Sequence, residues 1–171
     1  MPLTPFEQLP DHSRVWVFAA SRPLTEQETA PLLSATDEFL VKWTAHKVQL
    51  ASGRELRHRQ FLFVAIDEAI AGASGCSIDA LVHFMADAEK TLGARLTDNG
   101  AVWFRGANGS VECKSRPEFR KLAGAGAVGP DTTVFDNTIE TVGALRAGKW
   151  ETPLRRSWHL KAFFKDQFKL A

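Results

Sequence analysis

Apolar side chains recur along the chain with two periods, and these periods predict strands that alternate with helices. Residues 14–20, RVWVFAA, are rich in β-branched and aromatic side chains, which predicts a first strand. The continuous apolar run 61–66, FLFVAI, predicts a central strand that is covered on at least one face. Between them, apolar residues at helical spacing predict a helix that runs to about His46. Thr25 and Glu28 have the spacing of a capping box at its start.

Proline and glycine mark where the first half of the chain is expected to break. Pro31 lacks an amide hydrogen, so the regular part of the first helix is expected to begin only near Thr29. The chain is expected to be extended over residues 48–52, to turn at Gly53 and Arg54, and to return into the central strand.

The second helix has the clearest pattern in the chain. A loop of small residues is followed by an apolar stripe at helical spacing, and Gly93 supplies the stop. The stripe consists of Ile78, Leu81, Val82, Met85, Ala88 and Leu92.

The C-terminal half is predicted in shorter elements. AVWFR and SVECK flank residues 106–109, which predicts a hairpin with a four-residue loop. A second capping box at 115–118 opens a short helix that ends near Gly124. We expect a strand at 132–135 and a short helix after Thr141. The tail SWHLKAFFKDQF is also predicted to be helical.

The order of these elements predicts an α+β fold. The first part reads β-α-β-β-α-β, which is the order of the ferredoxin-like motif. We expect an N-terminal arm at 1–13 and a single domain at 14–171, because this length suits one hydrophobic core. Within that domain the core spans about 14–114, and about 115–171 form a C-terminal elaboration.

Charge and cysteine content exclude several classes of partner. Lys and Arg number 21 against 20 Asp and Glu, so no overall field draws the protein to nucleic acid or to a membrane. The N-terminal sequence MPLTPFEQLPDHSR has no apolar run, which predicts a cytoplasmic protein without a leader or anchor. Cys76 and Cys113 are expected to be free thiols.

The segment 143–150, GALRAGKW, resembles a phosphate-binding loop but departs from it. Trp150 stands where that loop needs Ser or Thr to hold magnesium, and the segment before it is polar. We therefore predict a short helix stopped by Gly148, and nucleotide binding is the least favoured function.

Cys76 is the strongest candidate for chemistry. It stands where a glycine-lined loop becomes a helix, and a helix N-terminus favours a thiolate over a thiol. A free cysteine is equally typical of simple packing. If the thiol is a nucleophile, Gly75, Ser77, Ile78 and Asp79 are the residues expected to hold the ligand. In that case the amides of Ser77 and Ile78 would receive an oxyanion.

A cysteine nucleophile needs a base and a group that orients the base. His83 lies about two turns along the same helix, roughly 10 Å from its start, which is long for direct contact. His46 and His159 are the remaining candidates, and the sequence does not choose between them. Asp67, at the end of the central strand, is the candidate that orients the histidine. A turn residue at that place is an equally good interpretation.

Metal and anion sites have weaker signals. No Cys-x-x-Cys or His-x-x-x-His spacing is present, so we expect neither a metal nor a cofactor. Arg54, Arg57, His58 and Arg59 form a basic patch that could meet an anion, or that could simply be a solvated strand edge.

The motif AGASGCSIDALVHF, taken with WTAH, DTTVF and SWH, resembles a family of small bacterial proteins of Bacteroidetes-like genomes that are often labelled ABC transporter ATPases. The resemblance covers about residues 14–164, and SGCSID is its most specific part. It implies no catalytic roles. The chain also lacks an intact Walker A loop and an ABC signature.

Two functions of different classes follow from these residues. One is a cysteine enzyme that acts on a small molecule by acyl or related transfer, with Cys76 as the nucleophile. The other is a non-catalytic module that binds a small anionic ligand or a partner. The sequence leaves the oligomeric state open.

Overall fold

The computed structural model describes residues 3–165, which form an α+β protein of two compact units. The first unit comprises residues 1–98 and 137–146, and the second comprises 99–136 and 147–171. Each has its own buried apolar cluster. The boundary differs from the expected one at 114/115, because the predicted hairpin belongs wholly to the second unit. Residues 166–168 of the expected tail helix lie outside the described residues.

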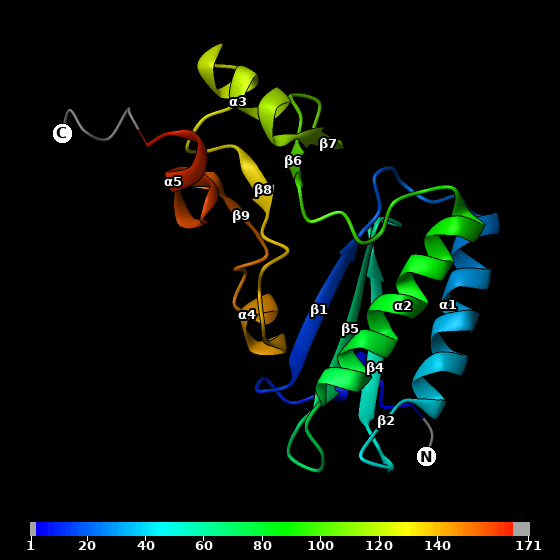
Figure 1. The fold of residues 1–171 in the computed structure, drawn as a ribbon. Coiled ribbons are helices and arrows are strands. Elements are labelled where there is room, and N and C mark those ends of the chain that lie inside the picture. The colour runs from blue at the N-terminus through cyan, green and yellow to red at the C-terminus, as the bar shows by residue number, and fades with distance from the viewer. Residues whose placement is uncertain (1–2, 166–171) are drawn as a thin grey trace. The chain divides into compact units, whose positions relative to one another are not determined.

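The first unit is built on a three-stranded antiparallel sheet with the order β1-β5-β4. Its strands are β1 (Arg14–Ala19), β4 (Ala51–Arg57) and β5 (Phe61–Asp67), and a small ribbon of β2 (Thr44–Ala45) and β3 (Val48–Gln49) stands apart. The helices α1 (Glu26–Lys42) and α2 (Gly75–Leu92) lie side by side over one face of the sheet (Figure 1). The rings of Phe39 and Phe84 stack between them at 4.7 Å.

Burial on both faces explains why β5 is continuously apolar. Leu62, Val64 and Ile66 face the helices and belong to their core cluster. On the opposite face Phe63 meets the ring of Phe6 at 6.3 Å. Phe6 belongs to the short 3₁₀ helix η1 (Phe6–Gln8), so the N-terminal arm is a packed part of this unit. The prediction of a covered central strand is confirmed.

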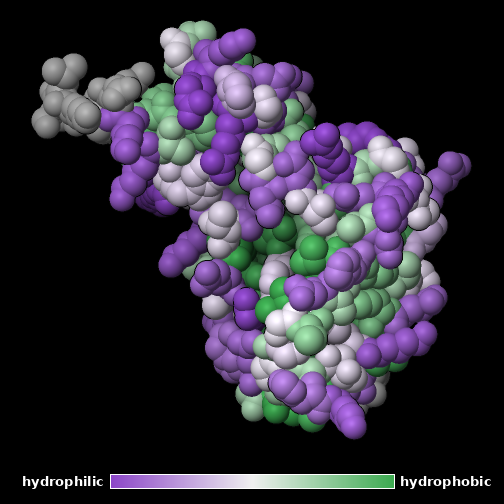
Figure 2. Space-filling view, viewed as in Figure 1, coloured by the Kyte–Doolittle hydropathy of each residue, from purple (hydrophilic) through white to green (hydrophobic). Residues whose placement is uncertain are grey.

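Capping explains where both long helices begin. Thr25 and Glu28 form the predicted capping box, and the helix starts at Glu26 rather than near Thr29. Pro31 is tolerated inside α1, where it removes only one backbone hydrogen bond. In α2 the N-cap is Ser74, and the helix ends as predicted at Gly93, whose φ is 62°. Hydrophilic side chains, in purple, lie along the outward face of these helices, with white and green groups between them (Figure 2).

The predicted turn at Gly53 is wrong. Gly53 lies inside β4, and the turn begins five residues later, where His58 and Arg59 adopt φ values of 53° and 51°. Gly53 is needed for close approach, because a Cβ there would lie 2.3 Å from the carbonyl oxygen of Thr4. Gly53 therefore leaves space for the N-terminal arm to pack against β4, and it does not form a turn.

The ferredoxin-like order is not confirmed. Its first three strands correspond to β1, β4 and β5, but the fourth expected strand, β6 (Ala101–Arg105), pairs in the sheet of the second unit. The free edge of β1 is instead met by an isolated bridge between Arg14 and Thr141, and the Val15 amide donates to the carbonyl oxygen of Glu140 at 3.0 Å. No helix of the described residues is long and apolar enough to cross a membrane.

The second unit has a four-stranded sheet with the order β7-β6-β8-β9. Besides β6 it contains β7 (Val111–Ser115), β8 (Thr133–Phe135) and β9 (Glu151–Pro153). Its helices are α3 (Arg116–Gly124) and α5 (His159–Phe163), with the 3₁₀ helix η2 (Leu154–Arg156) before the latter. The predicted hairpin, capping box and strand at 132–135 are confirmed to within a residue.

The segment 143–150 forms no phosphate loop. Gly143 lies inside α4 (Val142–Arg146), and a Cβ at this position would lie 3.0 Å from the carbonyl oxygen of Asp11. Gly148 adopts a φ of 74° after the helix, as the predicted helix stop requires. The glycines of this segment therefore serve packing and chain reversal.

Candidate functional site

Cys76 is exposed at the second residue of α2. No described residue donates a hydrogen bond to it or accepts one from it. Its helix start is already closed by a capping box, in which Ser74 and Ser77 exchange hydrogen bonds between side chain and backbone. The position is as predicted, and no described residue makes a hydrogen bond that would activate the thiol.

The two amides expected to receive an oxyanion are occupied. The Ser77 amide donates to the Ser74 hydroxyl at 3.1 Å, and the Ile78 amide donates to the Ser74 carbonyl oxygen at 3.0 Å. Ser77 is itself buried, and its carbonyl oxygen accepts from the indole Nε1 of Trp43 at 2.8 Å. Gly75 and Asp79 are exposed beside Cys76. An oxyanion would therefore reach the Ser77 and Ile78 amides only if the helix cap opened.

No histidine of the described residues makes a hydrogen bond with Cys76. His46 is exposed in the turn between β2 and β3, with a φ of 49°. His159 is buried inside the second unit, where its Nδ1 lies 2.8 Å from the Ser157 hydroxyl. Burial lowers the pKa of His159 to about 4, and the charge of Arg116 also lowers it, although Asp136 acts in the opposite direction. The imidazole of His159 is therefore neutral near pH 7 and enclosed.

Asp67 is engaged by neighbours other than the proposed base. Its carboxylate accepts a hydrogen bond from the Ala69 amide at 3.0 Å and lies 2.8 Å from Nε2 of His12. These two contacts lower the pKa of Asp67. The carboxylate therefore fixes the end of β5 and the N-terminal arm, which agrees with the alternative interpretation as a turn residue.

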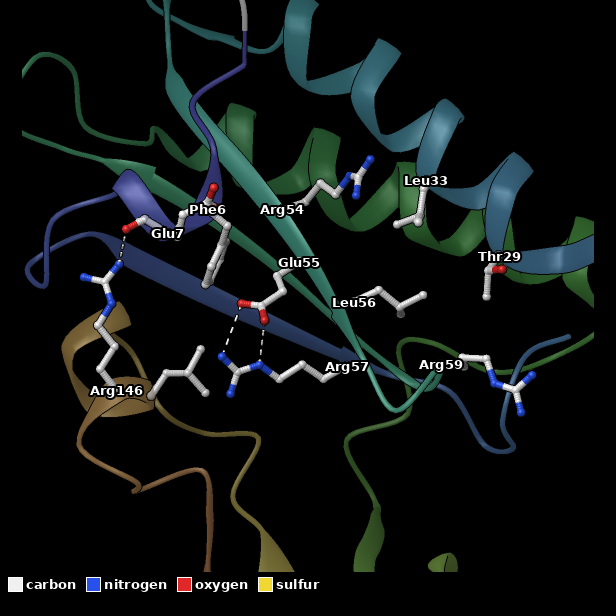
Figure 3. Close-up of a pocket in the computed structure, with 11 residues that line it drawn as sticks. Phe6, Glu7, Thr29, Leu33, Arg54, Glu55, Leu56, Arg57, Arg59 and Arg146 are labelled. Carbon is white, nitrogen blue, oxygen red and sulfur yellow. Dashed lines mark hydrogen bonds and ion pairs between the residues drawn. The ribbon is translucent and has the colours of Figure 1, made fainter. Parts of the chain in front are cut away.

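A cavity of about 560 Å³ lies along β4 in the first unit, and Cys76 is not among the residues that line it (Figure 3). Its charged lining consists of four arginines and two glutamates: Arg54, Arg57, Arg59, Arg146, Glu7 and Glu55. The remaining lining comes from the apolar residues Phe6, Leu33, Leu56 and Leu145, together with Thr29.

The cavity straddles the edge of β4 because alternate residues of a strand point to opposite faces. Arg54 and Leu56 extend on the side of α1, whereas Glu55 and Arg57 extend on the side of Phe6 (Figure 3). Arg54, Arg57 and Arg59, which are close together in the sequence, thus line one cavity. Arg146 of α4 lines the same cavity. Sequence spacing gave no sign that Arg146 would join it, because the two segments are far apart in the chain.

Ion pairs hold most of these guanidinium groups in place. Arg54 donates twice to Asp37, at 2.8 and 2.7 Å, and Arg57 binds Glu55 at 2.9 Å. Arg146 binds Asp11 at 2.6 Å, and its Nη2 also donates to the carbonyl oxygen of Glu7 at 3.1 Å. A bidentate ion pair fixes the guanidinium plane, so the donors it leaves unused have a defined direction.

Arg59 differs from the other three arginines. It lies in the turn after β4, is exposed, and makes no side-chain hydrogen bond or ion pair with any described residue. Its backbone is fixed, since its φ is 51° and its carbonyl oxygen accepts from the Leu24 amide at 2.8 Å. Of the four arginines that line the cavity, three are therefore oriented by ion pairs and one, Arg59, is unengaged. That arrangement can bind a carboxylate or phosphate group.

The described residues hold no cluster of three His, Cys, Asp or Glu side chains that could bind a metal ion. No family model, curated protein or solved structure matches the chain.

Proposed function

We propose that the protein is a binding module that holds an anionic ligand in the cavity beside β4. The proposal rests on the four arginines that line one cavity, one of which has no side-chain partner among the described residues (Figure 3). A guanidinium group suits carboxylate and phosphate because its fork of donors matches their oxygen atoms. The apolar lining would accept the carbon skeleton of the same ligand.

The proposal is tested with citrate and inorganic pyrophosphate as probes, by isothermal titration calorimetry at low and at physiological salt. Arg59→Gln removes the unengaged charge and is expected to weaken binding about tenfold, since a hydrogen bond to a charged group contributes about 1.5 kcal/mol or more. Arg95→Gln is the matched control, because Arg95 is exposed in the same unit and outside the cavity lining. Equal affinity for the two variants would contradict the proposal.

A cysteine enzyme is the second candidate, supported by the exposure of Cys76 at the start of α2. In this alternative His46 is the better base, since His159 is enclosed. Loss of a detectable transferase or hydrolase activity in Cys76→Ser, with binding of citrate unchanged, would favour the enzyme. We propose a ferredoxin-like relationship only for the first unit, on the order β1-β5-β4 of its sheet.

A further inference from the structure

The edge of β4 is only partly covered. The Thr4 amide donates to the carbonyl oxygen of Ser52 at 3.0 Å, so the N-terminal arm begins alongside β4 as a neighbouring strand would. Pro5 follows, has no amide hydrogen, and the arm then turns into η1. The pairing therefore stops after a single hydrogen bond.

Two residues of β4 beyond Ser52 keep their edge unpaired. In a strand the N–H and C=O of one residue point to the same side, and that side alternates along the chain. Since Ser52 points to the outer edge, Arg54 and Leu56 point there as well. Neither residue has a backbone partner at this edge among the described residues. The amide and carbonyl groups of Arg54 and Leu56, four groups in all, are thus available along this edge for pairing with another strand.

The cavity lies along this same edge. Arg54, Glu55, Leu56 and Arg57 all line it, so the space beside the unpaired groups is not filled by described parts of the chain (Figure 3). A neighbouring strand needs a gap of about 4.8 Å between backbones, and an exposed sheet edge is a template for such a strand. The arm already shows that extended chain fits against the start of β4.

We infer that the ligand of this cavity is an extended acidic peptide segment that adds to β4 as a further antiparallel strand. The inference rests on the function proposed above and names its ligand class. A small anion would contact the arginines on both sides of the β4 edge but would leave most of the unpaired backbone groups without a partner. An extended acidic peptide would engage both. Peptide recognition by strand addition takes affinity from the backbone and specificity from alternate side chains.

The side chains of β4 define the sequence that fits. Residues directly opposite each other in a ladder point to the same face. An acidic residue is expected opposite Arg57 and another opposite Arg54. An apolar residue is expected opposite Leu56, where it would meet Leu33 of α1. A residue without negative charge is expected opposite Glu55.

The test peptide is Thr-Glu-Val-Thr-Asp-Thr, acetylated and amidated, whose Glu, Val, Thr and Asp would lie opposite residues 57, 56, 55 and 54. Binding is measured with the whole protein by fluorescence anisotropy of a labelled peptide. Methylation of the backbone nitrogens of Val and Asp removes the two donors that would face β4. The matched control is the peptide methylated at the backbone nitrogens of Glu and of the Thr between Val and Asp. These amides would point away from β4.

The expected result is binding of the unmodified peptide, a loss of at least tenfold when Val and Asp are methylated, and little change in the control. Equal binding of both methylated peptides would overturn strand addition and leave the anion site standing. The same holds if citrate binds in an Arg59-dependent manner and no peptide does. A dimer in solution that prevents peptide binding would also overturn the inference, because a second copy would then occupy the edge. If neither citrate nor peptide binds, the proposed function itself fails.

Discussion

The amide of Thr4 donates to the carbonyl oxygen of Ser52 at 3.0 Å, and a Cβ on the next residue, Gly53, would lie 2.3 Å from the carbonyl oxygen of Thr4. The arm can therefore make this hydrogen bond to β4 only because residue 53 is glycine and has no Cβ. Phe6 of the same arm packs on Phe63 and closes one face of the sheet. The arm thus completes the core and also forms one wall of the cavity.

Replacing Gly53 by Ala is expected to displace the arm from β4. The added methyl group meets backbone and not the flexible end of a side chain, so the relief must come from movement of the arm. We expect a loss of about 1–3 kcal/mol in the free energy of unfolding, measured by urea denaturation. Gly75→Ala is the control, because a Cβ there meets nothing within 4 Å and favours a helix. A Gly53→Ala variant as stable as wild type would show that the arm does not need this close approach.

Glu89 fixes the chain that leaves α2. Its carboxylate accepts hydrogen bonds from the amides of Leu96 and Thr97, each at 2.6 Å, and from the Thr97 hydroxyl at 2.7 Å. Burial alone would raise the pKa of Glu89, but these hydrogen bonds lower it. Glu89→Ala leaves the two amides unpaired, and we expect a loss of about 1–3 kcal/mol in the free energy of unfolding.

The control for Glu89 is Asp87→Ala, which removes a highly exposed carboxylate whose only partner among the described residues is Lys90. Its effect is expected to stay within about 0.5 kcal/mol, as for most surface substitutions. Equal effects of the two variants, measured by urea denaturation, would contradict a fixing role for Glu89.

His159 makes the second unit sensitive to acid. Its pKa is about 4 in the folded chain, against 6.5 for an unperturbed histidine, so the unfolded chain binds the proton more readily. Stability is therefore complete above about pH 6.5 and falls as the pH drops toward 4, by on the order of 3 kcal/mol. Urea denaturation at several pH values between 4 and 7 measures the slope. His159→Gln is expected to reduce this slope between pH 5 and 7 whatever its own stability, and an unchanged slope would rule out His159 as its source.

Cys76 is expected to react as an accessible thiol without a catalytic partner. Iodoacetamide should label Cys76 in the native protein faster than the half-buried Cys113, as followed by peptide mass analysis. His46→Gln should leave the rate at Cys76 unchanged, since no described residue makes a hydrogen bond to this thiol. A tenfold slower reaction in that variant would instead support the cysteine enzyme.

Local signals predicted most of the elements. The capping boxes at Thr25 and Ser115 and the helix stop at Gly93 act through neighbouring backbone, so their sequence spacing is enough to place them. The turn after β4 was missed because His58 and Arg59 adopt the left-handed conformation that glycine usually takes. The function of Gly53 depends on a contact with Thr4, which no local pattern contains.

Strand pairing and the cavity could not be predicted, because both are formed by residues that are far apart in the sequence. The pattern of β6 predicts a strand but not which sheet it joins, and it pairs with β7 and β8. The sequence alone showed that basic residues are grouped at positions 54–59. The partners Asp37 and Asp11, and the approach of Arg146, follow only from the folded chain. Cys76 was placed correctly at a helix start, yet the cap that occupies the nearby amides was not foreseen.

Binding of an anion in the cavity beside β4 is tested most directly by titrating the ¹⁵N-labelled protein with citrate and following its amide and arginine Nε signals. Saturable shifts are expected at Leu56, Arg57 and Arg59, and these shifts should be lost in Arg59→Gln and kept in Arg95→Gln. Shifts confined to the loop before α2, around Cys76, or no saturable shift at all, would contradict anion binding in this cavity.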